Sequence, residues 1–464
     1  MVKQVPGIGK VISEVDATPK KRIIDALRRG DYILSDAVAE YVDNAIDAAR
    51  RKGAIPRGTK IEIGFDVTRR SVTIEDNGGG RSADEISKFV TLGESDLPDL
   101  ESMGIFGQAA KIAGMAVARR VVIMTHSSRS TPVGVVMTEE WLSEPSWMLP
   151  VFEPDEAIEP GVTIVRLEEM IIDPAEDLTE VAEEVRHDYG ERYAIVLKEN
   201  AGNLVIQVDG KAVRPSDPTD DLIDRPWAPS QYWCPTSVDR TLAGPSGRPM
   251  RVSLTVGLMQ RASIVGGYGA YVYCNGRLVV RDSDVGFTSK FKQHPEKARL
   301  RAVVRLQGNA YDMPWTPRKN SLDRNSPLYR VLERLLEQAY IDFFRPLRRE
   351  ISSKHRTMNE LIALHVADLI DSGKVAASDV PSSVASIANV RAVLEGEAPA
   401  GGAEEEEESN EEFIGGYLPK ALIESVRARM ERHYGQRMTK QGVLFEAFTI
   451  AEKRFGSEGD DDDA

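Results

Sequence analysis

The chain has 464 residues, too many for one compact core, which predicts two or three domains. Its 41% hydrophobic and 28% charged residues are ordinary for a globular protein. No apolar run approaches the roughly 18 residues that a transmembrane helix needs. Residues 1–22 lack the apolar core of a signal peptide, and Cys234 and Cys274 form no disulfide or metal pattern. We therefore expect a protein of the reducing cytoplasm without membrane contact.

The net charge of −14 is concentrated in two short stretches. Nine carboxylates lie in residues 395–412 and five more in residues 458–463. Without these acids, the remaining 59 acidic residues match the 59 basic ones, so the expected folded part is neutral. Composition therefore neither demands nor excludes a nucleic-acid partner.

The N-terminal third predicts a mixed set of helices and strands. Residues 20–170 alternate between the two types with glycine-rich turns between them. Within this part, residues 60–76 alternate apolar and polar side chains around a polar turn. This pattern predicts a hairpin of two half-buried strands.

A second set of elements follows. It comprises strands over residues 203–210, 251–259 and 270–280, and a long amphipathic helix over 328–347. Beyond residue 371 the chain is rich in Ala, Ser, Pro, Gly and Glu, which predicts a disordered linker.

The first stretch with chemical content is the helix predicted over residues 35–50, with Ser35 as its N-cap. Glu40, Asn44 and Asp47 fall at i, i+4 and i+7, opposite the apolar face. A carboxylate and an amide side by side can orient a water and complete the coordination of Mg²⁺, which prefers hard oxygen ligands. The alternative is the acidic, solvated face of an ordinary amphipathic helix.

The second stretch is residues 74–80, where a strand ends in Asp76 and Asn77 is followed by three glycines. The carboxylate of Asp76 can accept a hydrogen bond from an exocyclic amino group such as that of adenine. Gly78 and Gly80 let the backbone turn sharply and leave no side chain against a flat ligand. The alternative is a plain hairpin exit turn, but such a turn does not require three glycines after a strand carboxylate.

The third stretch is residues 91–116, in which Gly93 opens a polar segment and Gly104 and Gly107 precede a helix containing Lys111. Exposed backbone N–H groups and the helix dipole favour a phosphate at such a helix start. Lys111, one turn inside, can reach phosphate oxygens. A lone G-x-x-G serves packing more often than phosphate binding.

In this order, E-x-x-x-N on a helix, D-x-G-x-G after a strand and G-x-x-G before a helix resemble the ATP-binding motifs of the GHKL superfamily. That superfamily links DNA gyrase, the large heat-shock chaperone, histidine kinases and MutL. The resemblance implies an α+β fold, with a Bergerat-type ATP-binding α/β sandwich that holds ATP between a mixed sheet and a mobile lid. It also implies that the protein is an ATPase that uses ATP and Mg²⁺.

The resemblance assigns roles to individual residues. Glu40 matches the general base that polarises the attacking water, Asn44 the magnesium ligand and Asp76 the adenine-reading carboxylate. The other nucleotide-binding residues that it implies are Asp47, Gly78, Gly80, Gly93, Gly104, Phe106, Gly107, Lys111 and Thr163.

Two positions depart from the family's pattern. Ala109 stands where the family's lid usually has another glycine. Thr163 follows Gly161 and Val162, which places its hydroxyl one position later than the family's Gly-Thr.

Within the superfamily, the sequence is most similar to MORC-type ATPases. Residues 266–286 resemble a MORC-type strand pair ending in N-x-R-L, and residues 314–344 resemble the MORC pattern of a Pro-Thr loop, a lysine and a helix. This resemblance implies a smaller, transducer-like mixed α/β domain that sends Lys319 to the γ-phosphate. The alternative is a surface lysine beside Arg318.

The resemblance implies Mg²⁺-dependent ATP binding and slow hydrolysis that drive closure of a homodimer. We expect an ATP-gated clamp or switch in DNA maintenance or in defence against foreign DNA. One alternative is an ATP-switched, chaperone-like module that acts on a separately encoded protein partner without DNA contact. Another is a MutL-like or topoisomerase-B-like subunit.

The expected organisation has six regions. They are an ATP-binding domain (1–172), a transducer-like domain (173–350), a helical extension (351–375), an acidic disordered linker (376–416), a C-terminal helical element (417–456) and an acidic tail (457–464).

Overall fold

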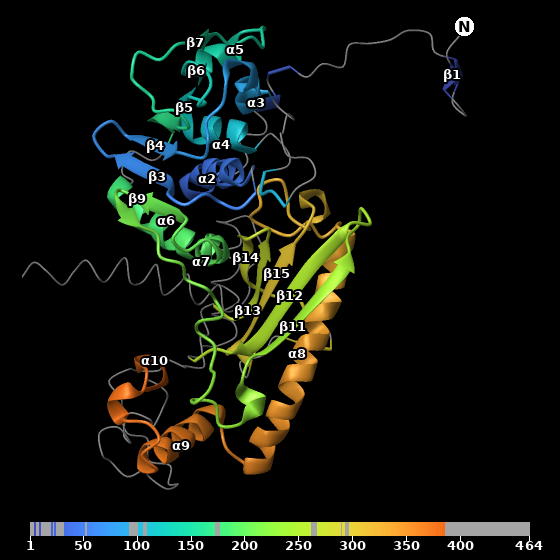
Figure 1. Ribbon diagram of the computed structural model, residues 1–464. Helices are drawn as coiled ribbons and strands as arrows, with labels where there is room; N and C mark the ends of the chain where they lie inside the picture. The colour runs from blue at the N-terminus through green and yellow to red at the C-terminus, as the bar shows by residue number, and fades with distance from the viewer. Residues whose placement is uncertain are drawn as a thin grey trace, which may run out of the picture. The chain divides into compact units, whose positions relative to one another are not determined.

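The computed structural model (Figure 1) describes residues that all lie in one compact unit, Met1–Pro399. They are residues 4–5, 9–10, 20–21, 23–24, 32–51, 53–91, 101–104, 109–171, 177–260, 267–288, 290–292 and 297–385. The predicted elements at 417–456 and 457–464 therefore lie outside the described residues.

The N-terminal half is built on an eight-stranded sheet with the order β10-β9-β3-β4-β8-β5-β6-β7. All neighbours are antiparallel except β3 and β9, which run parallel. The strands are β3 (Thr59–Asp66), β4 (Ser71–Asp76), β5 (Ala118–Thr125), β6 (Val133–Thr138), β7 (Val151–Phe152), β8 (Thr163–Met170), β9 (Leu204–Val208) and β10 (Lys211–Ala212). The hairpin predicted at residues 60–76 is confirmed as β3 and β4. A separate short pair is formed by β1 (Gln4–Val5) and β2 (Gly9–Lys10).

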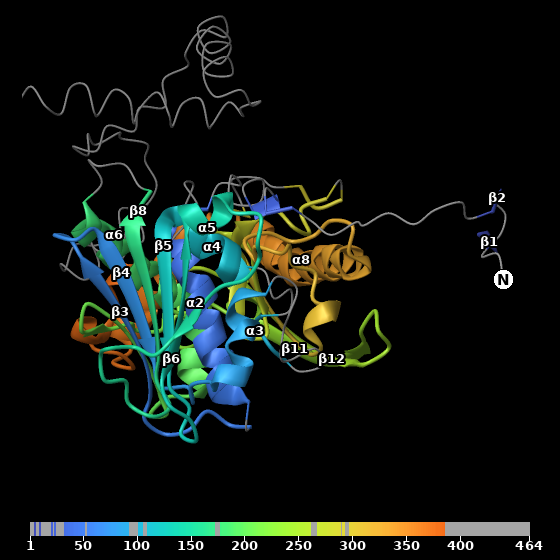
Figure 2. The ribbon, with the colours of Figure 1, turned by 90° about the horizontal axis from the view of Figure 1, so that it is seen from above.

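Helices cover one face of this sheet, with α2 and α4 lying directly against it (Figure 2). The described helices of this half are α2 (Leu34–Arg50), η1 (Ala83–Glu85), α3 (Ser87–Val90), α4 (Ala109–Val117), α5 (Glu139–Ser143), α6 (Leu178–Arg192) and α7 (Ala194–Glu199). The α/β sandwich predicted from the sequence is thus confirmed.

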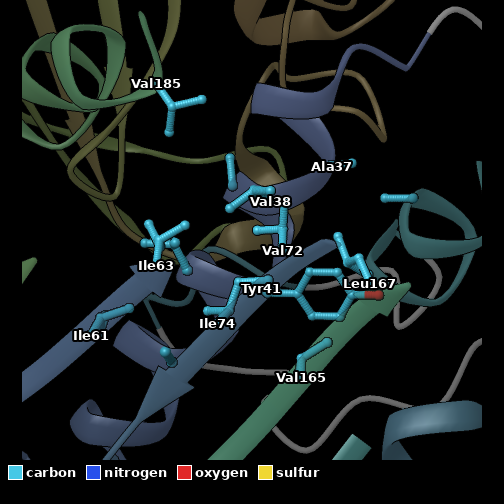
Figure 3. Packing of buried hydrophobic residues seen from close by; sticks show 14 of the residues in the cluster. Ala37, Val38, Tyr41, Ile61, Ile63, Val72, Ile74, Val165, Leu167 and Val185 are labelled. Carbon is cyan, nitrogen blue, oxygen red and sulfur yellow. The ribbon is translucent and has the colours of Figure 1, made fainter. Parts of the chain in front are cut away.

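The core of the sandwich forms where α2 meets β3, β4 and β8. Val38 and Tyr41 of α2 point toward Ile74 and Val165 of the sheet (Figure 3), and all four side chains are buried. The apolar stripe at helical spacing therefore selects the face of α2 that packs, as expected. The N-cap prediction was wrong, because α2 begins at Leu34 after Ile33, without a side-chain cap.

A second, five-stranded sheet has the order β11-β12-β15-β13-β14, with only β13 and β15 parallel. Its strands are β11 (Thr236–Ala243), β12 (Pro249–Leu258), β13 (Gly269–Cys274), β14 (Arg277–Ser283) and β15 (Leu300–Gln307). The further helices are η2 (Gln231–Trp233), η4 (Ala310–Asp312), α8 (Pro327–Lys354), α9 (Met358–Asp371), η5 (Ala377–Asp379) and α10 (Ser382–Ala385). The long α8 runs beside β11 and β12 (Figure 1) and buries Leu332 and Leu336 in the core of this half.

Two segments differ from the sequence prediction. Residues 204–208, expected among the second set of strands, extend the first sheet as β9 beside β3. Residues 376–385, expected to begin a disordered linker, form η5 and α10 instead. Val380 and Val384 are buried there in the same core as α8. This burial explains why residues 376–385 are ordered. Residues 386–416 of the predicted linker lie outside the described part of the chain.

Candidate active site

Helix α2 carries four polar side chains on the side away from its sheet-packed face. Glu40, Asp43 and Asp47 are 3%, 0% and 6% exposed, whereas Asn44 is exposed. Because these three carboxylates are buried, α2 does not present an acidic, solvated face, and that alternative interpretation of the helix is wrong. Buried carboxylates require hydrogen-bonding or charged partners, and the structure supplies them.

Lys319 is the partner of Glu40, although 279 residues separate them in the sequence. Its Nζ donates to Glu40 Oε2 at 2.7 Å and to Asp43 Oδ2 at 2.6 Å. Lys319 is 3% exposed and follows a turn in which its N–H donates to the carbonyl of Thr316. The alternative of a surface lysine is therefore wrong, because the loop between η4 and α8 carries this cation to the candidate catalytic base.

A second buried cation, Arg277 at the start of β14, completes the cluster. Its Nη1 lies 2.9 Å from Asp43 Oδ2 and 3.4 Å from Glu40 Oε1. Tyr193 donates its hydroxyl proton to Asp43 Oδ1 at 2.8 Å. Burial acts to raise the pKa of Asp43, but Arg277, Lys319 and the hydrogen bonds from Lys319 and Tyr193 bring it below its ordinary value. We call Glu40, Asp43, Arg277 and Lys319 the ionic quartet; its two positive and two negative charges balance.

Asp76 lies at the end of β4, where the chain turns. The Gly78 N–H donates to Asp76 Oδ1 at 2.8 Å. Burial raises the pKa of Asp76 to about 6, against the opposing effect of the Gly78 hydrogen bond. A Cβ at Gly78 would lie 2.9 Å from Asp76 Oδ1 and 3.1 Å from the Ala45 carbonyl oxygen, so only glycine fits between the carboxylate and α2.

The other side of this turn meets β5 and β8. Gly80 has φ +61°, and a Cβ there would lie 2.1 Å from the carbonyl oxygen of His126. Thr163 on β8 is the register partner of Asp76, and its Oγ1 lies 3.0 Å from Thr125 Oγ1. The structure thus places Thr163 directly across from Asp76, despite its shift by one position from the family's pattern.

Asp47 ties α2 to the end of the predicted lid. Its carboxylate accepts from the Met103 N–H at 3.0 Å and from the Gly104 N–H at 2.8 Å. Burial raises the pKa of Asp47 to about 6, opposed by these two backbone hydrogen bonds. A Cβ at Gly104 would lie 3.3 Å from Asn44 Oδ1, so the absence of a side chain lets the backbone approach the proposed magnesium ligand closely.

The remaining lid residues are only partly described. Gly93, Phe106 and Gly107 lie outside the described residues. Lys111 is buried on α4, where its Nζ donates to the carbonyl oxygen of Thr91. Ala109, the position where the family has glycine, is the first residue of α4.

The donor set fits a magnesium ion that is held mainly by its substrate. Within the described ranges, no group of three or more His, Cys, Asp or Glu side chains is arranged to hold a metal. Mg²⁺ typically takes one or two protein oxygens and completes its shell with phosphate oxygens and water. The exposed amide oxygen of Asn44, beside the Gly104 backbone, suits that role.

Two residues of the ionic quartet were not predicted as site residues. Asp43 lies at i+3 from Glu40, so the same helical spacing that selected Glu40 and Asp47 could have found it. Arg277 is the arginine of the N-x-R-L segment. The sequence did not indicate which carboxylate pairs with Arg277, because its contact with α2 joins residues more than 200 positions apart.

Among the described residues, no helix combines the length and the apolar character required to cross a bilayer.

The arrangement suits transfer of a phosphoryl group to water. It offers a buried carboxylate as base, an exposed amide for a metal, a half-buried carboxylate beside glycines for a planar ring, and a cation from the loop between η4 and α8. The reaction needs positioning and charge neutralisation more than covalent chemistry.

Comparison with known proteins agrees with this chemistry. Residues 32–160 match the family described as histidine kinase-, DNA gyrase B- and HSP90-like ATPase. Over 93 residues the chain is 30% identical to Protein MICRORCHIDIA 1 and 29% identical to Protein MICRORCHIDIA 3, both of Arabidopsis thaliana. Each match covers 20% of this chain, and they cover 14% and 16% of those two proteins, so the likeness spans under a fifth of each relative. Residues 32–160 thus carry the features of a histidine kinase-, DNA gyrase B- and HSP90-like ATPase domain, and the chain is also similar to the MICRORCHIDIA proteins.

Proposed function

We propose that this protein binds Mg²⁺–ATP on α2 and the β4 turn, hydrolyses it slowly, and uses the cycle to close and open a homodimer. The observation that carries the proposal is the direct contact between Lys319 and Glu40. It joins the loop between η4 and α8 to the carboxylate that matches a general base.

In this proposal the nucleotide's base stacks over the glycine turn, where Asp76 accepts a hydrogen bond from the exocyclic amino group. Thr163, opposite Asp76, supports the orientation of the base through the hydroxyl pair with Thr125. Asn44 supplies one oxygen to Mg²⁺, which neutralises phosphate charge. Lys111 leaves the Thr91 carbonyl to bind a phosphate oxygen, and the N–H groups of the first turn of α4, which have no partner within a helix, support it.

Glu40 orients the attacking water and takes its proton, a role that typically contributes 10²- to 10⁴-fold to the rate. Its burial excludes other water, but Lys319 occupies one carboxylate oxygen in the present arrangement. We propose that the γ-phosphate draws Lys319 away, which frees this oxygen for the water. Arg277 and Tyr193 stay with Asp43, so the departure does not leave Asp43 unpaired.

Loss of the γ-phosphate on hydrolysis would return Lys319 to the quartet and loosen the second sheet's hold on ATP. Because dimer closure rather than chemistry would limit the cycle, we expect slow turnover. The superfamily match and the likeness to MICRORCHIDIA proteins support a DNA-related switch. We propose an ATP-gated clamp in DNA maintenance or in defence against foreign DNA, acting within the cytoplasm.

The test compares Glu40→Ala and Asn44→Ala with wild type for nucleotide binding, ATP turnover and dimer formation with a non-hydrolysable ATP analogue. Glu40→Ala should bind and dimerise while kcat falls at least 100-fold. Asn44→Ala should fail to bind in Mg²⁺. Glu40→Gln is the matched control, because it keeps the side-chain shape and should also bind without turnover. Wild-type turnover in both alanine variants would refute the site assignment.

DNA involvement is tested separately. A clamp on DNA predicts that duplex DNA raises the ATPase rate and that the effect falls steeply with salt. If added DNA leaves the rate unchanged at low salt, an ATP-switched module acting on a protein partner becomes the better description.

A further inference from the structure

A cleft of about 760 Å³ lies between the C-terminal end of α2 and the second sheet. Its floor is formed by β12, β13 and β15, and its walls by the end of α2, residues 53–55, the end of α7 and residues 101–102. Among the described residues that line it, Asp47 alone belongs to the set assigned to ATP. The cleft is therefore distinct from the glycine turn where Asp76, Gly78 and Thr163 lie.

The lining of the cleft is rich in guanidinium groups. Its arginines are Arg50, Arg51, Arg248, Arg251 and Arg305, and its carboxylates are Asp47, Glu101 and Glu199. Positive charge thus exceeds negative charge by two. The chain outside residues 395–412 and 458–463 has no net charge as a whole, so this local excess is a property of the cleft rather than of the whole surface.

Two of these arginines donate hydrogen bonds to neutral acceptors. Arg50 donates to the carbonyl oxygen of Asn275 at 3.4 Å, and Arg251 to the amide oxygen of Gln307 at 3.3 Å. Glu101 accepts from the amide of Gln307 at 2.6 Å, and Asp47 is used by the Met103 and Gly104 backbone. A phosphate oxygen would form shorter and stronger charge-assisted hydrogen bonds with the two arginines than their neutral acceptors do.

The rest of the lining is mostly buried and already paired. Tyr273, Ile55 and Ile195 are at most 4% exposed, and the side chains of Asn200, Asn275 and Asn309 form hydrogen bonds within the chain. The arginines are therefore the groups that the cleft offers to a ligand. The volume lies within the roughly 300–1,000 Å³ of small-molecule sites. It accommodates one or two nucleotides rather than a base-paired helix.

We propose that this cleft binds a phosphate-bearing nucleotide ligand, supplied either as a free nucleotide or as the end of a nucleic-acid strand, independently of ATP. Binding does not depend on the proposed ATPase function. Only its effect on turnover rests on that function.

A ligand in the cleft would touch the chain close to the proposed ATP site. Ser102, which lines the cleft, accepts from the Asn275 amide at 3.0 Å, and Gly104 two residues later contacts Asp47. Occupancy should therefore alter nucleotide turnover through residues 101–104. The expected change is several-fold, which corresponds to a coupling free energy of about 1 kcal/mol.

The test uses the full chain with a saturating non-hydrolysable ATP analogue, so that the proposed ATP site on α2 and the β4 turn is filled. Inorganic pyrophosphate is followed by calorimetry, and a fluorescent single-stranded thymidine oligonucleotide by anisotropy. The variant is Arg248→Gln/Arg251→Gln, because both side chains are exposed and their loss should not affect folding. The matched control is Arg69→Gln/Arg330→Gln, two exposed arginines outside the cleft.

The cleft variant should bind the probe at least tenfold more weakly than wild type, and the control variant as well as wild type. Saturable oligonucleotide binding that pyrophosphate displaces identifies a nucleic-acid end, whereas pyrophosphate binding alone identifies a free nucleotide. No binding of either probe, or equal weakening in both double variants, overturns the proposal. Asn44→Ala should bind the oligonucleotide as tightly as wild type although the ATP analogue does not bind that variant, so failure of the ATPase proposal is separable from failure of this one.

Discussion

At the scale of single residues, the ionic quartet places four charged side chains, each at most 3% exposed, in direct contact. Asp43 and Arg277 are both fully buried. Two nitrogens of Arg277, Nε and Nη2, have no hydrogen-bond partner. Such a group is tolerated only because its charge is met by Asp43 and Glu40.

We predict that Arg277→Met lowers the free energy of unfolding by about 3–5 kcal/mol, because it leaves Asp43 buried with one cation fewer. The double variant Asp43→Asn/Arg277→Met should cost less than the sum of the two single variants, since both partners of the pair are then neutral. Urea denaturation measures all three.

The control for this cycle is Arg281→Met on the same strand. Arg281 pairs with Asp188 and Glu191, but its side chain is 42% exposed. Exposed pairs contribute only about 0–1 kcal/mol, so this variant should stay near wild type. Equal losses at Arg277 and Arg281 would contradict the buried-pair account.

A second residue-scale prediction concerns pH. Because burial raises the pKa of Asp76 to about 6, the folded protein holds a proton there that the unfolded chain has already released. The stability contribution is therefore present below the ordinary aspartate pKa and is lost as pH rises through about 6. Adenine binding needs the ionised form, so affinity should rise in the same window.

Between pH 5 and pH 7 the ratio of nucleotide affinity in wild type to that in Asp76→Asn should rise about tenfold. Taking the ratio cancels the ionisation of the nucleotide itself. Parallel pH profiles for the two proteins, measured by fluorescence titration, would show that Asp76 does not contact the base.

The sequence singled out candidate residues but not the contacts between them. Helical spacing selected Glu40, Asn44 and Asp47, and the glycine run selected Asp76. Neither could predict Arg277, because a contact across more than 200 residues depends on how two sheets pack rather than on local periodicity.

At the scale of elements, α10 extends the second core beyond the predicted end of the fold. Val384 is fully buried against the core that α8 supports. We predict that Val384→Ala lowers the free energy of unfolding by about 1–2 kcal/mol, since it removes buried methyl groups.

The exposed Ser378→Ala serves as the comparison and should melt like wild type. If Val384→Ala also melts unchanged in calorimetry, residues 376–385 do not contribute to the core.

Patterns of alternation predicted the elements that pack on one side only. The β3–β4 hairpin and the amphipathic α2 and α8 were found for this reason. The position of β9 could not be found, because a strand's periodicity states which face is buried and not which sheet it joins. Composition was misleading at residues 376–385. Burial of two valines there stabilises a structure that the surrounding Ser, Pro and Ala did not predict.

At the scale of the whole described unit, Asn275 links the segment before α4 to the second sheet. Its amide donates to the Ser102 carbonyl, and its Oδ1 accepts from the Gly308 N–H at 3.0 Å. One side chain in the turn between β13 and β14 therefore joins the end of the predicted lid to β15.

We predict that a non-hydrolysable ATP analogue slows amide hydrogen exchange both in residues 74–80 and in β15. In Asn275→Gly the slowing in β15 should be lost while that in residues 74–80 remains. Glycine suits this test because Asn275 has φ +51°, which glycine adopts without strain. Loss of slowing in both regions would instead indicate that the variant no longer binds the nucleotide.

The balanced charges of the quartet have a consequence for affinity. If the terminal phosphate recruits Lys319 as proposed, the chain supplies its own competitor for the nucleotide, because Glu40 and Asp43 already pair with that lysine. The protein would thus bind ATP less tightly than an isolated pocket with a free lysine. In return, the same two acids would help to expel the spent nucleotide by reclaiming Lys319.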